Sequence, residues 1–132
     1  MSKIVLEVIQ PTQCKVKGEY DHVIIPGVDG DFGILENHTP FITKIRPGIL
    51  QLYKGKSVEK FAIHDGFVTV DSNMVTIISD VIEKENEIDS KRAESSKKRA
   101  EKRLKSAMGD VDFRRAEFAL KKALTRLKLL TS

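Results

Sequence analysis

Three glycines and a histidine in the first third of the chain have the spacing that most suggests chemistry. Gly27, Gly30 and Gly33 recur at every third position of the stretch IPGVDGDFGILENHTPFITKIRPG, and His38 follows them. Glycine-rich loops bind phosphate when a helix N-terminus follows, in the patterns GxGxxG or GxxxxGK[ST]. The spacing here is GxxGxxG, and no helical pattern begins behind it. We therefore predict that these glycines permit positive-φ turns in a loop-rich segment between strands.

Nucleophilic and metal chemistry lack the residues that they need. No Ser or Cys lies in a recognisable nucleophile elbow, so a histidine base has no hydroxyl or thiol to activate. His22, His38 and His64 have no metal-ligand spacing and are interpreted as structural or interface residues. The single Cys14 excludes an internal disulfide and a multi-cysteine metal site. We therefore predict no catalytic residue and no metal site, which argues against an enzyme and against a small hydrolase in particular.

The composition is typical of a soluble globular protein. The chain has 132 residues, of which 40% are hydrophobic and 32% charged, enough for one domain or for one small domain with an appendage. No apolar run approaches the ~18 residues of a membrane span. The charged start MSKIVLEVIQ lacks the apolar core of a signal peptide. We expect a cytosolic or peripheral protein.

The net charge of +4 hides two regions of opposite character. Residues 1–85 carry nine Lys and Arg against twelve Asp and Glu, a net charge of −3. Residues 86–132 carry fourteen against seven, a net charge of +7. Because the hydrophobic pattern changes at the same place, we predict two domains, residues 1–85 and residues 86–132.

The first region has the pattern of short strands. Its apolar residues occur in short runs rich in Val, Ile and Phe, and turn formers separate the runs. YKGKS and DSN are typical of hairpin turns, and the Pro-Gly pairs at 26 and 47 mark strand ends. The pattern predicts an N-terminal antiparallel β-sandwich or flattened barrel. The runs are KIVLEVI, HVII, GILQLY, KFAIH, GFVTV and MVTIIS.

The second region has the pattern of two helices and a short turn. Residues 89–107 contain no Gly, Pro or β-branched residue, and Asp89 suits the N-cap because its carboxylate accepts from free backbone N–H groups. We expect Gly109 to mark the stop and Asp112 to cap the second helix. Spacings of three and four then predict a heptad seam, and with it a C-terminal antiparallel two-helix hairpin. The seam residues are Phe113, Ala116, Leu120, Ala123, Leu127 and Leu130.

The predicted seam between the helices is weak. The first helix offers mainly Ala93, Ala100 and Ala107, and burying a methyl contributes ~0.8 kcal/mol, against ~1.5–3 kcal/mol for a fully buried leucine. Isolated helices of this length are marginal in water. We therefore expect the hairpin to need a partner surface, and to exchange one surface for another at a cost of only about a few kcal/mol.

Four segments together resemble the epsilon subunits of F-type ATP synthases. They are PGVDGDFGILENHTPFITKIRPGIL, FAIHDGFVTVDSNMVTIISD, EIDSKRAESSKKRAEKRL and GDVDFRRAEFALKKALTRLKLL, in the family's order and spacing. The resemblance implies a non-catalytic central-stalk subunit that couples proton-driven rotation to ATP synthesis. Its sandwich would bind the gamma subunit and the c-ring of the membrane sector. It would lie peripherally on the cytoplasmic side of a bacterial inner membrane, held there through the complex, and an organellar origin stays open.

The resemblance assigns subunit contacts to the glycine-bearing segment. It implies that Asp29, Asp31 and Phe32 lie near the polar loops of the c-ring and that His38 lies near gamma. Acidic residues that face a loop carrying Arg fix the register of a contact more than its affinity. A merely solvated acidic loop is the alternative interpretation of each residue.

The resemblance implies two positions for the hairpin. It lies folded against the sandwich, or it extends into the alpha/beta catalytic head and restrains ATP hydrolysis there. Basic residues of the second helix would then pair with acidic loops of the catalytic subunits. The alternative is the solvated face of an amphipathic helix. These residues are Arg114, Arg115, Lys121, Lys122 and Arg126.

The resemblance also implies a regulatory ATP site in the folded hairpin, without hydrolysis by this chain and without any required cofactor. Cationic side chains from both helices would converge on the phosphates, and Ile88 and Ala93 would leave apolar room for adenine. Lys122 stands where binding members have Arg, which loses the planar fork and weakens affinity. The alternative is an N-capping Asp with nearby salt bridges. The implied residues are Glu83, Ile88, Asp89, Arg92, Ala93, Arg99, Lys122 and Arg126.

A basic helical hairpin that binds nucleic acid is the alternative function. A net charge of +7 is sufficient for it. However, the chain has no Trp and two Tyr, and Phe113 and Phe118 are the aromatic residues of the basic region. Because stacking platforms are missing, we rank this function second and expect no nucleic-acid partner.

Overall fold

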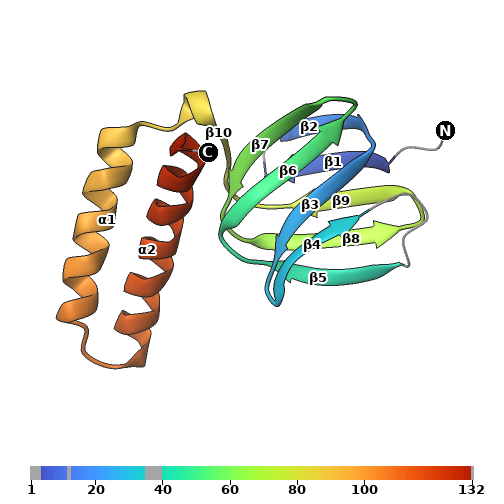
Figure 1. The fold of residues 1–132 in the computed structure, drawn as a ribbon. Helices are drawn as coiled ribbons and strands as arrows, with labels where there is room; N and C mark the ends of the chain where they lie inside the picture. Colours follow the sequence, from blue (N-terminus) through green and yellow to red (C-terminus); the bar gives the residue numbers. More distant parts are fainter. Residues whose placement is uncertain (1–3, 12, 35–39, 132) are drawn as a thin grey trace.

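The computed structural model of the chain describes residues 4–11, 13–34 and 40–131. A β-sandwich is followed by two antiparallel helices that lie beside it (Figure 1), so the predicted fold class is confirmed. The 3-10 turn η1 (Glu85–Glu87) leads to α1 (Ser90–Lys105) and α2 (Asp110–Thr131). The strands are β1 (Ile4–Gln10), β2 (Gln13–Tyr20), β3 (His22–Gly27), β4 (Gly30–Ile34), β5 (Phe41–Ile45), β6 (Gly48–Lys54), β7 (Ser57–Ile63), β8 (Gly66–Asp71), β9 (Met74–Ile78) and β10 (Ile82–Lys84).

The strands form one sheet that folds over into two layers. Their order is β10-β7-β6-β3-β5-β8-β9-β1-β2, and β4 pairs with β3 as a hairpin. The sheet turns its corner between β3 and β5, which share a single pairing, Gly27 with Ile45. As a result β7, β6 and β3 form one layer, and β8, β9 and β1 the other (Figure 1).

One pairing in the sheet is parallel, whereas an entirely antiparallel sandwich was predicted. β1 runs alongside β9 in the same direction, with Val5 opposite Met74 and Ile9 opposite Ile78. Adjacent strands joined by a tight turn must be antiparallel, but strands far apart in the chain are free of that constraint. β1 and β9 are separated by most of the sandwich, so local turn signals carry no information about their direction.

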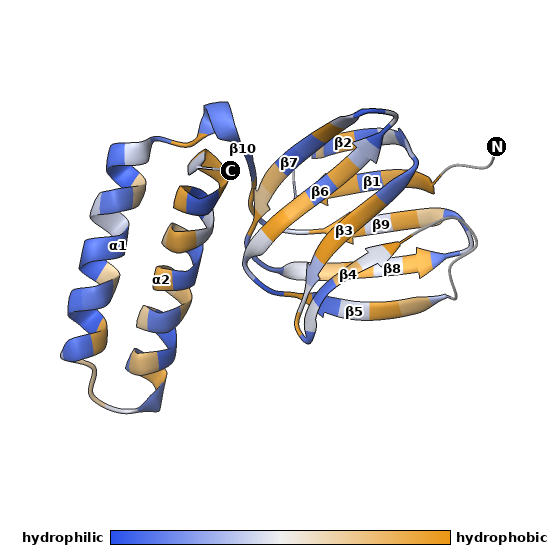
Figure 2. Cartoon of the chain, viewed as in Figure 1, coloured by the Kyte–Doolittle hydropathy of each residue, from blue (hydrophilic) through white to orange (hydrophobic). Residues whose placement is uncertain are grey.

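The core follows the two-residue period of the strands. Ile4, Leu6 and Val8 of β1 are fully buried, while their neighbours are partly exposed. β8 and β9 show the same alternation, since Val68 and Ile77 are fully buried. Successive side chains of a strand point to opposite faces, so one face of each layer is apolar and packs inward. Figure 2 shows hydrophobic and hydrophilic residues interspersed along the strands.

The three equally spaced glycines lie on a hairpin formed by β3 and β4. β3 and β4 pair from Val23 with Ile34 to Gly27 with Gly30, and of the three equally spaced glycines Gly30 alone has a positive φ, +129°. Gly27 is required for space, because a Cβ there would lie 2.7 Å from the Phe32 ring. The prediction of positive-φ turns is therefore correct for one glycine of three. The predicted turns YKGKS and DSN are confirmed, with positive φ at Gly55 and Ser72.

Small residues make the contact between the two helices. Ala93 and Ala100 of α1 and Ala116 and Ala123 of α2 are 0–3% exposed. Alanines allow the helix backbones to approach closely but bury little area per residue. α2 lies nearer the sheet and contacts β6 and β7, while α1 packs on the far side of α2 (Figure 1).

The structure of α2 differs from the prediction in three details. Phe113 is 48% exposed because it lies in the first turn of α2, at the end of the hairpin away from β10 (Figure 1). Thr125 and Leu129 are buried although they lie off the seam, because α2 has a second contact face toward the sheet. Asp112 does not cap α2, which begins at Asp110, and the carbonyl of Gly109 accepts the Phe113 N–H at 3.2 Å.

A salt bridge fixes the connection between the sheet and the helices. Lys15 Nζ on β2 lies 2.6 Å from Glu87 Oε2 in η1. The other carboxylate oxygen of Glu87 accepts the Lys84 N–H at 2.9 Å. The hydrogen bond from Lys15, followed by that from the Lys84 backbone, holds the pKa of Glu87 below its usual range. The turn that follows β10 is thereby attached to β2 at the other edge of the sheet.

Candidate functional site

A polar cluster joins α2 to the sheet. Oε1 of Glu83, on β10, accepts from Arg126 Nε at 2.6 Å and lies 2.9 Å from His64 Nε2. The His64 side chain is 2% exposed. Because an ionised carboxylate only accepts hydrogen bonds, His64 Nε2 carries the proton. Nδ1 is then a bare nitrogen, buried without a hydrogen-bond partner among the described residues.

The pKa values in this cluster favour a neutral His64 beside an ionised Glu83. Burial lowers the pKa of His64, and the charges of Arg126 and Lys122 lower it further against the opposing effect of Glu83. Burial raises the pKa of Glu83, but the hydrogen bonds from Arg126 and His64, with their charges, outweigh burial and lower it. At neutral pH the cluster is therefore an Arg126–Glu83 ion pair supported by a neutral imidazole.

A cavity of about 320 Å³ lies next to this cluster, between η1, α1 and α2. It brings together seven of the eight residues that the resemblance implied for ATP. Two further residues, Glu87 and Ser96, complete the lining and were not predicted from the sequence. Helical spacing gives a signal for Ser96, which lies four residues after Arg92 and three before Arg99. The seven predicted residues are Glu83, Ile88, Asp89, Arg92, Ala93, Arg99 and Arg126.

The cavity presents three guanidinium groups from both helices. Arg126 uses Nε for Glu83, and Arg99 donates to the hydroxyls of Ser95 and Ser96 at 3.1 Å. The Arg92 guanidinium has no ion pair or hydrogen bond among the described residues. Planar guanidinium forks suit the bidentate binding of phosphate oxygens. The arrangement is therefore able to hold a phosphate-bearing anion where the helices and η1 meet.

The local structure of Asp89 supports the start of α1. Its Oδ1 accepts the Arg92 N–H at 3.1 Å, so the predicted N-cap is confirmed. This bond fixes the first turn of α1, which carries Arg92 and Ala93. Ala93 is only 3% exposed, so Ile88 provides most of the apolar surface that these two residues offer to a ligand.

Lys122 is the one implied ATP residue that does not line the cavity. Its ammonium lies 5.0 Å from the centre of the Phe118 ring, a cation–π distance. The effect of its charge on the pKa of His64 shows that it still acts electrostatically at the cluster. Lys122 therefore contributes positive charge near the site without a place in the cavity wall.

The basic residues predicted to act in inhibition are divided between two sides of α2. Arg115, Lys122 and Arg126 are spaced by seven and four, which places them on one side, and Arg114 and Lys121 are seven apart on the adjacent side. Arg114, Arg115 and Lys121 are exposed, whereas Lys122 and Arg126 are partly buried. Arg126 is engaged with Glu83, so the folded hairpin leaves only part of this set free for a partner.

The residues predicted to contact the c-ring lie on the β3–β4 hairpin. Asp29 is exposed in the turn, and Asp31 on β4 forms a 2.5 Å ion pair with Arg46. Phe32 packs edge-to-face on Phe41, with ring centres 5.3 Å apart, and lies against the core. His38, for which the resemblance implied a contact with gamma, lies outside the described residues.

An exposed apolar patch on the β5-β8-β9 layer was not predicted. Phe67 is 53% exposed and pairs across strands with Ile78, also 53% exposed, and Ile42 on β5 is 68% exposed. Ile42 is opposite Thr69, two residues from Phe67, so all three side chains share the outer face. The patch could have been predicted from the sequence, because these apolar residues occupy positions of alternating strands that should face solvent. Such a contiguous patch is typical of a protein-binding surface.

The described residues have neither a membrane-spanning helix nor a metal-binding cluster. No helix there is long and apolar enough to cross a membrane. Within the same residues, no group of three or more His, Cys, Asp and Glu side chains is placed to hold a metal ion.

Comparisons with known proteins follow the same two-part division. Residues 3–85 match the family model of the ATP synthase delta/epsilon chain beta-sandwich domain, and residues 86–130 match that of its long alpha-helix domain. The chain belongs to the ATP synthase epsilon chain family. It is therefore a non-catalytic subunit of the ATP synthase central stalk.

Relatives named ATP synthase epsilon chain cover nearly the whole sequence. The one from Desulfitobacterium hafniense is 43% identical over 122 residues, 92% of each chain. The one from Desulforamulus reducens is 37% identical over 123 residues, 93% of each chain. The same fold is also found in a chain of the Euglena gracilis mitochondrial ATP synthase (OSCP/F1/c-ring in rotational state 1). That chain has a TM-score of 0.85 at 21% identity, over 98% of this chain and 82% of its own.

Proposed function

We propose that this subunit couples rotation to ATP synthesis by binding the gamma subunit and the c-ring through its sandwich, on the cytoplasmic side of a bacterial membrane. The apolar patch of Ile42, Phe67 and Ile78 supports a gamma-binding surface, because apolar side chains at the centre of an interface supply most of its affinity. The exposed turn with Asp29 supports a polar contact with the ring. In this arrangement the subunit reaches the membrane only through its partners.

We propose further that the hairpin restrains ATP hydrolysis when it leaves the sandwich and extends into the alpha/beta head. The alanine contact between the helices and the few polar ties of α2 to the sheet support a hairpin that can undock. Arg114, Arg115 and Lys121 are exposed and available for acidic loops of the catalytic subunits. Undocking would release Lys122 and Arg126 as well.

The proposal of regulation by ATP rests on the cavity next to Glu83. This cavity is lined by seven of the residues that the resemblance implied for ATP, which come from β10, the connection after it and both helices. A nucleotide bound there requires the folded hairpin, because Glu83 belongs to the sandwich and Arg126 to α2. Ligand that binds only this state stabilises it by RT ln(1 + [L]/Kd). We propose that ATP holds the hairpin folded and thereby relieves the inhibition.

Arg92→Ala tests the nucleotide site in the purified chain. Removing a charge-assisted contact to phosphate is expected to weaken ATP binding about ten- to a hundredfold, since such a bond contributes about 1.5–3 kcal/mol. Lys91→Ala is the matched control, because Lys91 is adjacent and exposed but does not line the cavity. Isothermal titration calorimetry measures both, and an intact chain that shows no ATP binding would refute the site.

Deletion of residues 88–132 tests the inhibitory role in the assembled enzyme. We expect a higher rate of ATP hydrolysis by membranes, with gamma and the c-ring still co-purifying with residues 1–87. Unchanged hydrolysis with intact assembly would remove the inhibitory role and leave the coupling role standing.

A further inference from the structure

A second cavity, of about 330 Å³, lies between β6 and α2 and is separate from the first. We call it the β6–α2 cleft. Its walls belong to two bodies, since Arg46 and Lys60 come from the sandwich and Lys121 and Lys128 from the hairpin. No lining residue is shared with the cavity that contains Arg92. The family resemblance assigned no ligand to this cleft.

The cleft has an excess of positive charge on both walls. Asp31 is its one carboxylate, and it is already paired with Arg46 at 2.5 Å. Among the described residues, the one ion pair of Lys121 is an exposed contact with Glu117 on the same helix, at 3.5 Å. Lys60 and Lys128 have no ion pair among the described residues.

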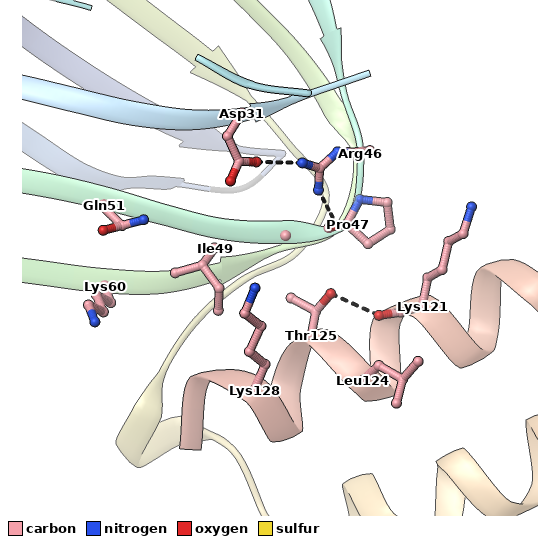
Figure 3. A pocket seen from close by; sticks show the side chains of 11 residues that line it. Asp31, Arg46, Pro47, Ile49, Gln51, Lys60, Lys121, Leu124, Thr125 and Lys128 are labelled. Carbon is pink, nitrogen blue, oxygen red and sulfur yellow. Dashed lines mark hydrogen bonds and ion pairs between the residues drawn. The ribbon is translucent and has the colours of Figure 1, made fainter. Parts of the chain in front are cut away.

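The close view shows where these cationic side chains lie around the cleft (Figure 3). Lys128 extends from α2 toward Ile49, on the strand side of the cleft, and Lys60 lies further along the same wall. Arg46 lies at the opposite end beside Asp31. Ile49 and Leu124 are apolar residues of the cleft lining, Ile49 on the strand side and Leu124 on α2. A ligand of several negative charges can therefore contact both walls at once.

The charges in the cleft oppose docking when it is empty of anions. Like charges that face each other across an interface repel, and salt only partly screens them. Within the described residues, the Arg126–Glu83 pair is the ion pair that attracts α2 to the sandwich. An anion between the walls would replace repulsion by attraction from both sides.

We propose that the β6–α2 cleft binds a phosphate-bearing polyanion that holds α2 against the sandwich. Lysine and arginine are the side chains that bind phosphate, and a volume near 330 Å³ exceeds the need of a single small ion. This site acts on the same docked state as the nucleotide cavity but through different residues. Two ligands that each require docking therefore bind with positive cooperativity.

Titration with inorganic tripolyphosphate tests the cleft in the full chain carrying Arg92→Ala, which weakens anion binding in the first cavity. We expect saturable binding at 0.15 M salt that Lys60→Gln with Lys128→Gln weakens about a hundredfold, roughly tenfold for each charged contact. Lys56→Gln with Lys105→Gln is the control of equal charge, since both lysines are exposed and outside the cleft. The control pair is expected to change the affinity less than about twofold.

Backbone amide shifts in NMR locate the ligand. Shifts at Ile49 and Leu124 on addition of tripolyphosphate would support the cleft, and so would slower hydrogen exchange in α2. Equal loss of affinity in the cleft and control pairs would overturn the proposal, as would shifts confined to residues around Ile88 or the absence of saturable binding. No ATP is added, and every sample carries Arg92→Ala. The outcome for the cleft is therefore independent of whether the first cavity binds ATP.

A further experiment distinguishes a phosphate carried by a lipid from a free phosphate anion. Vesicles of phosphatidylcholine with phosphatidic acid, compared with phosphatidylcholine alone, present the phosphate on a lipid. Retention on the acidic vesicles that requires Lys60 and Lys128 would support the cleft with a lipid headgroup as its ligand. Tripolyphosphate binding without such retention would support it with a free anion.

Discussion

The sandwich and the hairpin differ in what stabilises them. The sandwich encloses large, fully buried side chains such as Leu6, Leu50 and Phe61, drawn from both layers. The hairpin closes on alanines, and Leu129 is its one leucine buried to 2% among the described residues. Burial of apolar surface contributes about 25 cal/mol per Å², so the large buried side chains of the sandwich stabilise it more than the buried alanines stabilise the hairpin. We therefore expect the sandwich to be the more rigid half, and we expect a few substitutions to weaken the docking of the hairpin.

The two halves also differ in how they use charge. In the sandwich the described ion pairs lie at the surface, where such pairs contribute about 0–1 kcal/mol. Between sandwich and hairpin, the partly buried Glu83 pair and the cationic cleft act on the docking equilibrium itself. Electrostatics therefore has more effect on the position of the hairpin than on the folding of the sheet.

The largest expected effect is a core truncation in the sandwich. Leu6→Ala removes a fully buried side chain and is expected to lower the free energy of unfolding by about 2–5 kcal/mol, because a cavity remains. Chemical denaturation followed by circular dichroism measures the change. Val58→Ala is the control, since Val58 is 42% exposed and its loss should cost less than about 0.5 kcal/mol. Equal effects of the two variants would mean that the sandwich is not the rigid half.

A smaller effect, confined to the hairpin, is expected from overpacking its seam. Ala123→Leu inserts three carbon atoms between the helices, where Ala123 is 0% exposed, and should cost about 1–3 kcal/mol. Hydrogen exchange should quicken in α1 and α2 but stay unchanged in β8 and β9. Lys98→Leu, on the exposed side of α1, is the control. Faster exchange in both halves would show that they unfold as one unit and would contradict the comparison.

The smallest effect concerns pH. In the docked structure burial, together with the charges of Arg126 and Lys122, lowers the pKa of His64. We expect undocking to return that pKa toward its ordinary value. The docked state then binds fewer protons, and its stability is fully present above about pH 6.5 and is lost as the pH falls below that value. Glu83, whose pKa is also lowered, extends the loss below about pH 4.5.

Hydrogen exchange in α2 between pH 7.5 and 5.0 measures this dependence, after correction for the intrinsic effect of pH on exchange. We expect faster opening of α2 at low pH and no comparable change in the strands. His64→Gln keeps a hydrogen-bonding side chain but does not titrate, so it should abolish the change between pH 7 and 5.5. A dependence that survives in His64→Gln would assign it to another group.

Features set by neighbouring residues could be predicted from the sequence. The Asp89 N-cap, the turns at Gly55 and Ser72, and the division into strands and helices all depend on local chemistry, and the structure shows them. The cavity residues were grouped by resemblance, and helical spacing alone would have placed Arg92, Ser96 and Arg99 on one face. Whether they bind ATP stays a prediction.

Features set by distant contacts could not be predicted in this way. The parallel pairing of β1 with β9 depends on strands far apart in the chain. The burial of Thr125 and Leu129 depends on the sheet beside α2, and the β6–α2 cleft exists only because two separate elements meet. The seam prediction considered one partner for α2, whereas α2 has two.

The salt bridge between Lys15 and Glu87 limits where the chain can bend if the helices move relative to the sheet. Because Glu87 is tied both to β2 and to the Lys84 backbone, the chain up to that residue moves with the sheet. The first free joint is at Ile88 and Asp89, which have extended backbone angles and precede the first turn of α1. We therefore expect the hairpin to undock by rotation about this two-residue connection, and a ligand that contacts Ile88 to restrict that rotation.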